Sequence, residues 1–328
     1  MKPPSRSATD SSPPAAESRK TARDFHPEVL KLFDAYVHGA LDRRGFLERA
    51  AKFAVGGASA LGLLEALSPR FAEAQQIRPT DTRLKSEYIE IASPRGYGKV
   101  RGYLTRLAKP SGKLPLVLVV HENRGLNPHI EDVARRVALE KFIAFAPDAL
   151  FPLGGYPGDE DKARELFPKL DQTKTREDFL ASVGFLKRMP EGNAKVGVVG
   201  FCYGGGIAHF LSTRLPDLGA AVPFYGMSPA PEEAAAVRTP LQVHLAERDD
   251  RINTAWPAYE AALKAAKIRF EVHTYPGTEH GFHNDTTPRY DETAAKLAWT
   301  RTIALFNSTL RTSPSATMPA KKPVKPPK

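Results

Sequence analysis

The length, composition and charge of the chain exclude several classes of protein at the outset. Of its 328 residues, 41% are hydrophobic, which is enough for one large core or two small ones. The formal net charge is +10, and the lysines between 313 and 328 supply a good part of it. That stretch is rich in proline and lacks periodicity, so we predict a disordered basic tail over 313–328. The sequence has no internal repeat and no basic face with interleaved aromatic residues, so we expect no nucleic-acid partner.

Two segments precede the main domain. Residues 1–41 form an N-terminal extension whose first 23 residues are polar and rich in Pro, Ser and Ala, so we expect disorder there. Residues 42–74 resemble a twin-arginine export signal, beginning with Asp42-Arg43-Arg44-Gly45-Phe46-Leu47. An uncharged run over 53–64 follows, too short to span a bilayer as a helix, and Ala72-Glu73-Ala74 offers a cleavage site of small residues. We therefore expect the twin-arginine machinery as a partner and a periplasmic or otherwise exported location.

The same region has an alternative interpretation as an amphipathic helix from Pro27 through Leu47. Asp24 could cap its start, Pro27 would lie in its first turn, and apolar residues recur at helical spacing. In that interpretation Arg43 and Arg44 lie on the solvated face of the helix.

Between 77 and 312 the sequence alternates between strand and helix patterns, which predicts one α/β domain. A turn at Gly96-Tyr97-Gly98 suggests an antiparallel entry hairpin, and the unbroken apolar run 116–120 is typical of a strand buried on both faces. The predicted strands are 88–91, 100–107, 116–120, 142–146, 195–199, 219–225, 241–245 and 268–275. The predicted helices are 130–139, 159–170, 176–189, one beginning at 207, 255–267 and 292–310. This order predicts an eight-stranded, mostly parallel sheet with helices on both faces, in which ligands bind beyond the carboxyl ends of the strands.

The sequence Gly200-Phe201-Cys202-Tyr203-Gly204 lies between the predicted strand 195–199 and the helix that begins at 207. This is the nucleophile-elbow pattern, with cysteine where serine is usual. A nucleophile on so sharp a turn has a strained backbone, and its neighbours two residues away must lack Cβ to let the chain pass. The helix start places N–H groups beside the sulfur, which favours thiolate. The alternative is a buried structural cysteine; as the only cysteine of the chain, Cys202 cannot form an intramolecular disulfide.

Two further candidates follow later strands. Asp249 comes after the strand 241–245 and His280 after the strand 268–275, so the order nucleophile, acid, histidine is that of α/β-hydrolases. His280 would take the thiol proton, while Asp249 would orient the imidazole and stabilise its cation. Asp249 is preferred because an Asp-x-x-hydrophobic pattern starts there. The neighbouring acids are expected to be solvated turn carboxylates: Asp250 and Glu247.

Other histidines near His280 have weaker claims. His273 falls inside a predicted strand and is expected to pack there, whereas His280 follows the strand directly and has a glycine behind it. His280, His283 and Asp285 could be metal ligands, but His-x-x-His without a clear third ligand is a weak signal. We therefore expect no metal and no cofactor.

The oxyanion hole is predicted in the segment His121-Glu122-Asn123-Arg124-Gly125, which follows the strand 116–120. Folds of this kind place one oxyanion-hole N–H there and take the other from the residue after the nucleophile, here Tyr203.

With these motifs, the chain from about 87 to 310 resembles the dienelactone hydrolase (carboxymethylenebutenolidase) family. The matching pieces occur in order: the Glu122 loop, Ala146-Pro147-Asp148, the Cys202 elbow, the Asp249 loop, and Pro276-Gly277-x-x-His280-Gly281-Phe282. The resemblance implies the α/β-hydrolase fold and a catalytic triad of Cys202, Asp249 and His280.

The resemblance also implies roles in the oxyanion loop. In the family a glutamate there hydrogen-bonds the resting thiol until substrate displaces it, a role that carries over to Glu122. The backbone of Asn123 would be the second oxyanion donor. The family's type enzyme has an arginine four residues after the catalytic histidine, where it grips a substrate carboxylate. Here that position is Asn284, and Arg124 and Arg289 are the candidates to replace it.

We therefore expect a hydrolase of small-molecule esters or lactones that acts through a thioester, as a monomer or small homo-oligomer. Thiolate leaves more readily than alkoxide or amine, so substrates with acidic leaving groups are favoured over peptides and triglycerides. The alternative is a thiol-dependent redox or binding protein on a hydrolase scaffold, which would need Cys202 but neither Asp249 nor His280. The absence of a second, resolving cysteine from the sequence counts against a disulfide cycle.

Overall fold

The computed structural model describes residues 19–55 and 59–311. The predicted basic tail lies outside this part of the chain, and so do the first 18 residues of the N-terminal extension and residues 56–58 of the uncharged run. Composition predicted disorder up to residue 23, but Ala22–Asp24 form a 3₁₀ turn.

The domain is built on an eight-stranded sheet. Its strands are β1 (Leu84–Ser93), β2 (Gly98–Leu107), β3 (Leu114–Val120), β4 (Ile143–Pro147), β5 (Gly192–Phe201), β6 (Ala220–Phe224), β7 (Leu241–Arg248) and β8 (Phe270–Glu279). Their order across the sheet is β1-β2-β4-β3-β5-β6-β7-β8. Strand β2 runs antiparallel to both of its neighbours, and every neighbouring pair from β4 to β8 is parallel. The predicted entry hairpin and mostly parallel sheet are confirmed.

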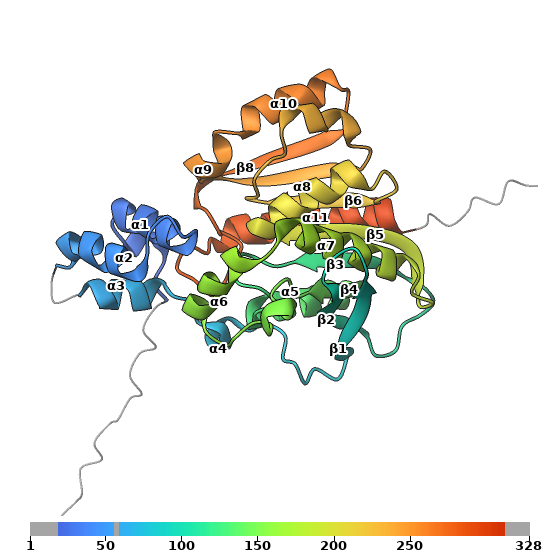
Figure 1. The fold of residues 1–328 in the computed structure, drawn as a ribbon, viewed down its shortest axis with the longest axis horizontal. Helices are drawn as coiled ribbons and strands as arrows, with labels where there is room; N and C mark the ends of the chain where they lie inside the picture. Colours follow the sequence, from blue (N-terminus) through green and yellow to red (C-terminus); the bar gives the residue numbers. More distant parts are fainter. Residues whose placement is uncertain (1–18, 56–58, 312–328) are drawn as a thin grey trace, which may run out of the picture.

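Helices cover both faces of this sheet (Figure 1). They are α5 (Pro128–Leu139), α6 (Glu160–Leu166), α7 (Gln172–Lys187), α8 (Tyr203–Arg214), α9 (Asp250–Asn253), α10 (Trp256–Ala265) and α11 (Glu292–Leu310). The single helix predicted over 159–170 is wrong in its second half. There α6 gives way to a 3₁₀ turn, Phe167–Lys169, because Pro168 has no N–H to continue the α-helical pattern.

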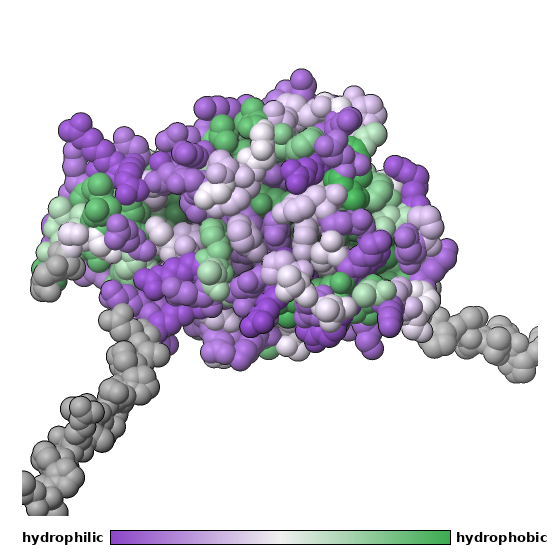
Figure 2. Space-filling view, turned by 90° about the horizontal axis from the view of Figure 1, so that it is seen from below, coloured by the Kyte–Doolittle hydropathy of each residue, from purple (hydrophilic) through white to green (hydrophobic). Residues whose placement is uncertain are grey.

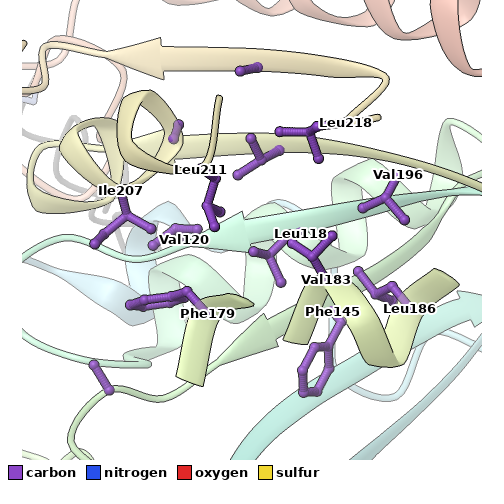
Figure 3. Close-up of a cluster of buried hydrophobic side chains, with 14 of the residues drawn as sticks. Leu118, Val120, Phe145, Phe179, Val183, Leu186, Val196, Ile207, Leu211 and Leu218 are labelled. Atoms are coloured by element: carbon purple, nitrogen blue, oxygen red, sulfur yellow. The ribbon is translucent and has the colours of Figure 1, made fainter. Parts of the chain in front are cut away.

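The sheet separates two apolar cores, and β3 contributes to both. Leu116, Leu118 and Val120 face the core that α7, α8 and α10 cover, while Val117 and Val119 face the core under α5 and α11. This alternation is the two-residue period of a strand. Figure 3 shows side chains of α7 and α8 meeting those of β3 in the first core. Full burial of each of these β3 side chains contributes about 1.5–3 kcal/mol, so the central strand is firmly held.

Four helices precede the sheet: α1 (Pro27–Val37), α2 (Arg43–Ala50), α3 (Ala60–Leu67) and α4 (Phe71–Ala74). The first three, here called the N-terminal bundle, share an apolar cluster that includes Phe33, Phe46 and Leu67. The bundle lies to one side of the sheet, at the left of Figure 1. Figure 2 shows apolar surface over the same part of the molecule, where Val55 and Leu61 are exposed.

The amphipathic helix considered over 27–47 is in fact two helices. Helix α1 ends at Val37, and Gly39 then takes a φ of 80°, a left-handed conformation that ends helices. His26 caps α1 by accepting from the N–H of Glu28, in place of the expected Asp24. None of the helices within residues 19–55 and 59–311 has the length and apolar character needed to cross a membrane.

The chain reverses its direction across the sheet between β3 and β5. After β3 it crosses to β4 on one side, and it then returns to β5 on the other side of β3. A reversal of this kind opens a crevice at the carboxyl ends of the two strands. The Glu122 loop follows β3 and Cys202 follows β5, so both predicted loops lie at this crevice.

Candidate active site

Cys202 sits on a strained turn between β5 and α8. Its backbone has φ 55° and ψ −112°, a conformation that costs energy for a residue with a side chain. A Cβ on Gly200 would lie 1.9 Å from the carbonyl oxygen of Gly204, so only glycine fits there. The N–H of Cys202 donates to the carbonyl of Phe224 at 3.0 Å, which ties the turn to the end of β6. This is the geometry that the elbow pattern predicts.

His280 and Asp249 form a buried pair beside this turn. The Nδ1 of His280 lies 2.6 Å from Oδ2 of Asp249, and both side chains are almost completely buried. This contact fixes the proton of the neutral ring on Nδ1 and leaves Nε2 for chemistry. Asp250 is exposed, as expected, although it begins α9 and does not lie in a turn.

The histidines with weaker claims lie elsewhere. His283 stacks on Phe201 with ring centroids 5.0 Å apart, inside the second core. His273, on β8, stacks on His244 of the neighbouring strand β7. His280 and His283 therefore do not share a ligand position, which removes the basis of the metal interpretation that joined them to Asp285.

A second histidine reaches the sulfur, and sequence reasoning did not single it out. The Nε2 of His38, just after α1, lies 3.3 Å from Sγ of Cys202, and the rings of His38 and His280 meet edge to face at 4.8 Å. The Nδ1 of His38 lies 3.2 Å from Oδ1 of Asp34, one helical turn earlier. The spacing Asp34-x-x-x-His38 in a predicted helix was the available signal, but nothing local says that it faces Cys202.

The two histidines set the charge state of the sulfur. Burial raises the pKa of the Cys202 thiol, but the charges and hydrogen bonds of His280 and His38 outweigh burial and lower that pKa to about 5. Burial lowers the pKa of His280, yet the thiolate and Asp249 raise it to about 10. Near neutral pH the site therefore holds a thiolate facing an imidazolium, which is the reactive form of a catalytic cysteine.

The oxyanion loop differs from expectation at Glu122. The Oε2 of Glu122 accepts from the side-chain amide of Asn284 at 2.9 Å, while the sulfur of Cys202 has His38 as its hydrogen-bond partner. Asn284 occupies the position where the family's type enzyme has its substrate-binding arginine. Tyr203 is the first residue of α8, so its N–H has no partner inside the helix and is available as an oxyanion donor.

The two arginines proposed for substrate binding face the N-terminal bundle. Arg124 Nη2 donates to the carbonyl oxygen of Val37 at 3.0 Å. Arg289 Nη1 lies 3.5 Å from Oδ1 of Asp34, and its guanidinium stacks over the ring of Phe33. Both side chains are thus used to hold α1 against the domain.

A cavity of about 360 Å³ opens beside the sulfur. A space of this size fits a small organic molecule. Besides Cys202 and His38, the lining includes three arginines that the sequence did not mark: Arg176, Arg214 and Arg251. Arg214 Nη2 bonds Glu233 at 2.7 Å, and Arg251 Nη2 lies 3.0 Å from Nε2 of His38. Arg176 stacks on Phe210 and has no acidic partner within the described residues. The cavity therefore suits a ligand that carries negative charge.

Comparison with known proteins agrees with this geometry. The sequence profile of the Dienelactone hydrolase family matches residues 100–310. The chain belongs to the dienelactone hydrolase family. It is accordingly an ester or lactone hydrolase with an α/β-hydrolase fold. A second profile, described as YqhI-like, matches residues 17–52, the stretch that carries α1, α2 and His38.

Individual relatives of this dienelactone hydrolase family member agree with the profile. YghX of Escherichia coli K12, a "Putative hydrolase fragment", is 57% identical over 115 residues, which are 35% of this chain and 98% of that protein. A "Putative carboxymethylenebutenolidase" from Synechocystis is 30% identical over 233 residues, covering 65% of this chain and 93% of that protein. The crystal structure of a "Putative Dienelactone Hydrolase" from Klebsiella pneumoniae superposes with a TM-score of 0.60 at 29% identity, covering 68% of this chain and 99% of that one.

Proposed function

We propose that this dienelactone hydrolase family member cleaves esters or lactones through a covalent thioester on Cys202, with His280 and Asp249 as the other members of its triad. The observation that carries the proposal is the buried 2.6 Å contact between His280 and Asp249 beside a cysteine on a strained elbow. The lowered pKa of the thiol supports it, because a nucleophilic thiolate is then present at neutral pH.

The reaction follows from these positions. The thiolate attacks the carbonyl carbon, and the backbone N–H groups of Tyr203 and Asn123 stabilise the oxyanion, each contributing about 3–4 kcal/mol. The leaving oxygen takes the proton from Nε2 of His280 as its bond to carbon breaks. His280, now neutral, then takes a proton from water, whose oxygen attacks the thioester and expels the thiolate. A tetrahedral adduct with a poor leaving group would expel sulfur instead, so enol lactones and activated esters are the favoured substrates.

The arginines of the cavity narrow the proposed substrate class further. A carboxylate on the acyl or leaving part of the substrate could pair with Arg176 at the cavity wall. The proposed substrates are therefore small anionic esters or lactones with acidic leaving groups, bound by Arg176 in place of Arg124 and Arg289.

The test is hydrolysis of a panel of p-nitrophenyl esters and enol lactones by wild type and by Cys202→Ala. We expect the variant to lose activity while its circular dichroism and melting temperature remain those of a folded protein. If it keeps most of its activity toward activated esters, Cys202 is structural and the proposal is wrong. A redox or binding protein would need Cys202 but tolerate replacement of His280 and Asp249, so those variants separate it from a hydrolase.

We also propose export, on the strength of Arg43-Arg44 followed by Phe46-Leu47. In the folded chain Arg43 pairs with Asp161 at 2.8 Å and Phe46 is fully buried, so the signal would have to leave these contacts to be recognised. Cleavage after Ala74 would remove His38 and the N-terminal bundle from the active site, so the export we propose is of a chain that keeps this segment. Cell fractionation of wild type and of Arg43→Lys/Arg44→Lys tests this. Export predicts wild type outside the cytoplasm and the variant inside it; both proteins at full length in the cytoplasm would rule it out.

A further inference from the structure

The N-terminal bundle is held against the active site by polar contacts from several elements. The carbonyl oxygen of Val37 accepts from the side chains of both Asn123 and Arg124, each at 3.0 Å. Arg43 of α2 pairs with Asp161 of α6 at 2.8 Å. The end of α1 is thus bonded directly to the oxyanion loop, and His38 follows it by one residue.

His38 is oriented as a catalytic histidine would be. Its Nδ1 lies 2.8 Å from the carbonyl oxygen of Asp34 and 3.2 Å from the carboxylate of the same residue, so Nδ1 must carry a proton. Only Nε2 remains to face Cys202, at 3.3 Å from Sγ. This repeats with different residues the relation of His280 to Asp249, in which a carboxylate holds one ring nitrogen and the other is free for the reacting atom.

The charged groups around His38 act in both directions. The thiolate of Cys202 and the carboxylate of Asp34 favour its protonated form. Burial, the imidazolium of His280 and the guanidinium of Arg251, 3.0 Å from Nε2, oppose it. The contacts with the thiolate and with Asp34 outweigh burial and the opposing charges, so the pKa of His38 is raised above its usual value. Arg251 is partly exposed at the cavity wall, and its Nε also lies 3.8 Å from Oδ2 of Asp34, so that carboxylate offsets part of its charge beside His38.

We propose that His38 is a second catalytic histidine of this enzyme: protonated, it donates from Nε2 to the Cys202 thiolate, and Asp34 positions its ring. The inference rests on the proposed function and deepens it. It also places part of the active site outside residues 100–310, in the N-terminal segment that matches a different profile.

The role follows from the two points at which sulfur is a thiolate. Before attack, the N–H of His38 stabilises the nucleophile. During deacylation, the oxygen of water bonds to the acyl carbon and its proton passes to His280. The C–S bond then breaks, and its electron pair returns to a sulfur that faces the His38 N–H. Glu122 does not compete for this position, because its carboxylate is bonded to Asn284.

The decisive experiment measures the rate of Cys202 alkylation by iodoacetamide as a function of pH. It uses the full chain, with EDTA present to remove metal ions that could bind the thiolate. The lowered thiol pKa predicts that the wild-type rate rises as pH increases through about 5 and is flat above, whereas an ordinary cysteine rises near 8.5. His38→Gln keeps the size and a hydrogen-bonding group but cannot carry charge. We expect its profile to move upward by about one pH unit, so that alkylation at pH 4 becomes about tenfold slower.

Two further variants keep the test specific. Asp34→Asn leaves His38 in place and should shift the profile in the same direction by a smaller amount. His26→Gln is the matched control, because His26 is an exposed histidine at the other end of α1, and its profile should superimpose on wild type. Equal melting temperatures exclude loss of the fold as the cause.

Superimposable profiles for wild type and His38→Gln would overturn the inference. Faster alkylation together with a higher kcat in the variant would also overturn it, because His38 would then only obstruct access to the sulfur. Failure of the proposed function gives a different result. In that case Cys202→Ala keeps its esterase activity, whatever the alkylation profiles show.

Discussion

Two glycines in the first turn of α8, Gly204 and Gly206, give a stringent test of the elbow. A Cβ on Gly204 would lie 2.3 Å from the carbonyl oxygen of Val120 and 2.7 Å from that of His121. Both atoms belong to the backbone of β3 and the oxyanion loop, so no flexible side chain can move aside. A Cβ on Gly206, in the same helix, would lie 3.6 Å from its nearest neighbour, an ordinary contact. Alanine therefore fits one position and not the other.

The magnitudes follow from this difference. Replacing glycine by alanine inside a helix is worth about 1 kcal/mol of stabilisation at either site. At Gly204 the overpacking costs about 1–3 kcal/mol, and relief of the clash must displace the helix or the oxyanion loop. We expect Gly204→Ala to melt several degrees below Gly206→Ala, at about 2–4 °C per kcal/mol, and to lose at least tenfold in kcat/KM as the oxyanion donor moves.

Differential scanning calorimetry and esterase assays of the two variants measure both effects. Gly206→Ala should melt at or above the wild-type temperature. If the two variants show the same melting temperature and the same activity, the close approach of α8 to β3 at the elbow is not as described.

Three other predictions concern the site. Asp249→Asn should lower kcat by about 10²- to 10⁴-fold, while Asp250→Asn, an exposed neighbour, should change it little; equal effects would mean that the wrong acid has been chosen. Glu122→Gln should leave the pH profile of Cys202 alkylation unchanged, because Glu122 is bonded to Asn284; faster alkylation at pH 7 would restore the role that the family resemblance gives this glutamate. Arg176→Gln should raise KM for anionic esters by up to about fivefold and leave their neutral analogues unaffected, the modest size reflecting an exposed charge; equal changes for both substrates would exclude charge recognition at Arg176.

Sequence patterns predicted best what depends on neighbours along the chain. The helix over Glu292–Leu310 has the predicted bounds because Asp291 caps its start: its carboxylate accepts from the N–H of Ala294 at 2.9 Å. The triad candidates could be located because each one follows a strand, and parallel strands bring their carboxyl ends to the same edge of the sheet. The fold class, and the meeting of these candidate residues at one edge of the sheet, are therefore readable from local signals.

Contacts between distant segments were not readable in the same way. The partner of the Cys202 sulfur lies 164 residues away, on a segment whose docking depends on shape and on scattered polar contacts. Arg124 and Arg289 were sensible candidates to bind a substrate carboxylate, but both side chains instead bind residues of α1, at Val37 and Asp34. A single sequence shows which side chains could bind a carboxylate. It does not show whether each one contacts the substrate or another segment of the same protein.

The central claim, that Cys202 forms a thioester, is tested most directly by mass spectrometry of the acylated protein. Wild type mixed with an activated ester and quenched in acid during turnover should carry one acyl group, which peptide mapping should place on the peptide that contains Cys202. Neutral hydroxylamine should remove it, as expected for a thioester. An acyl group on another residue of the cavity wall, such as Ser228, or rapid turnover with no acylated protein, would contradict the account.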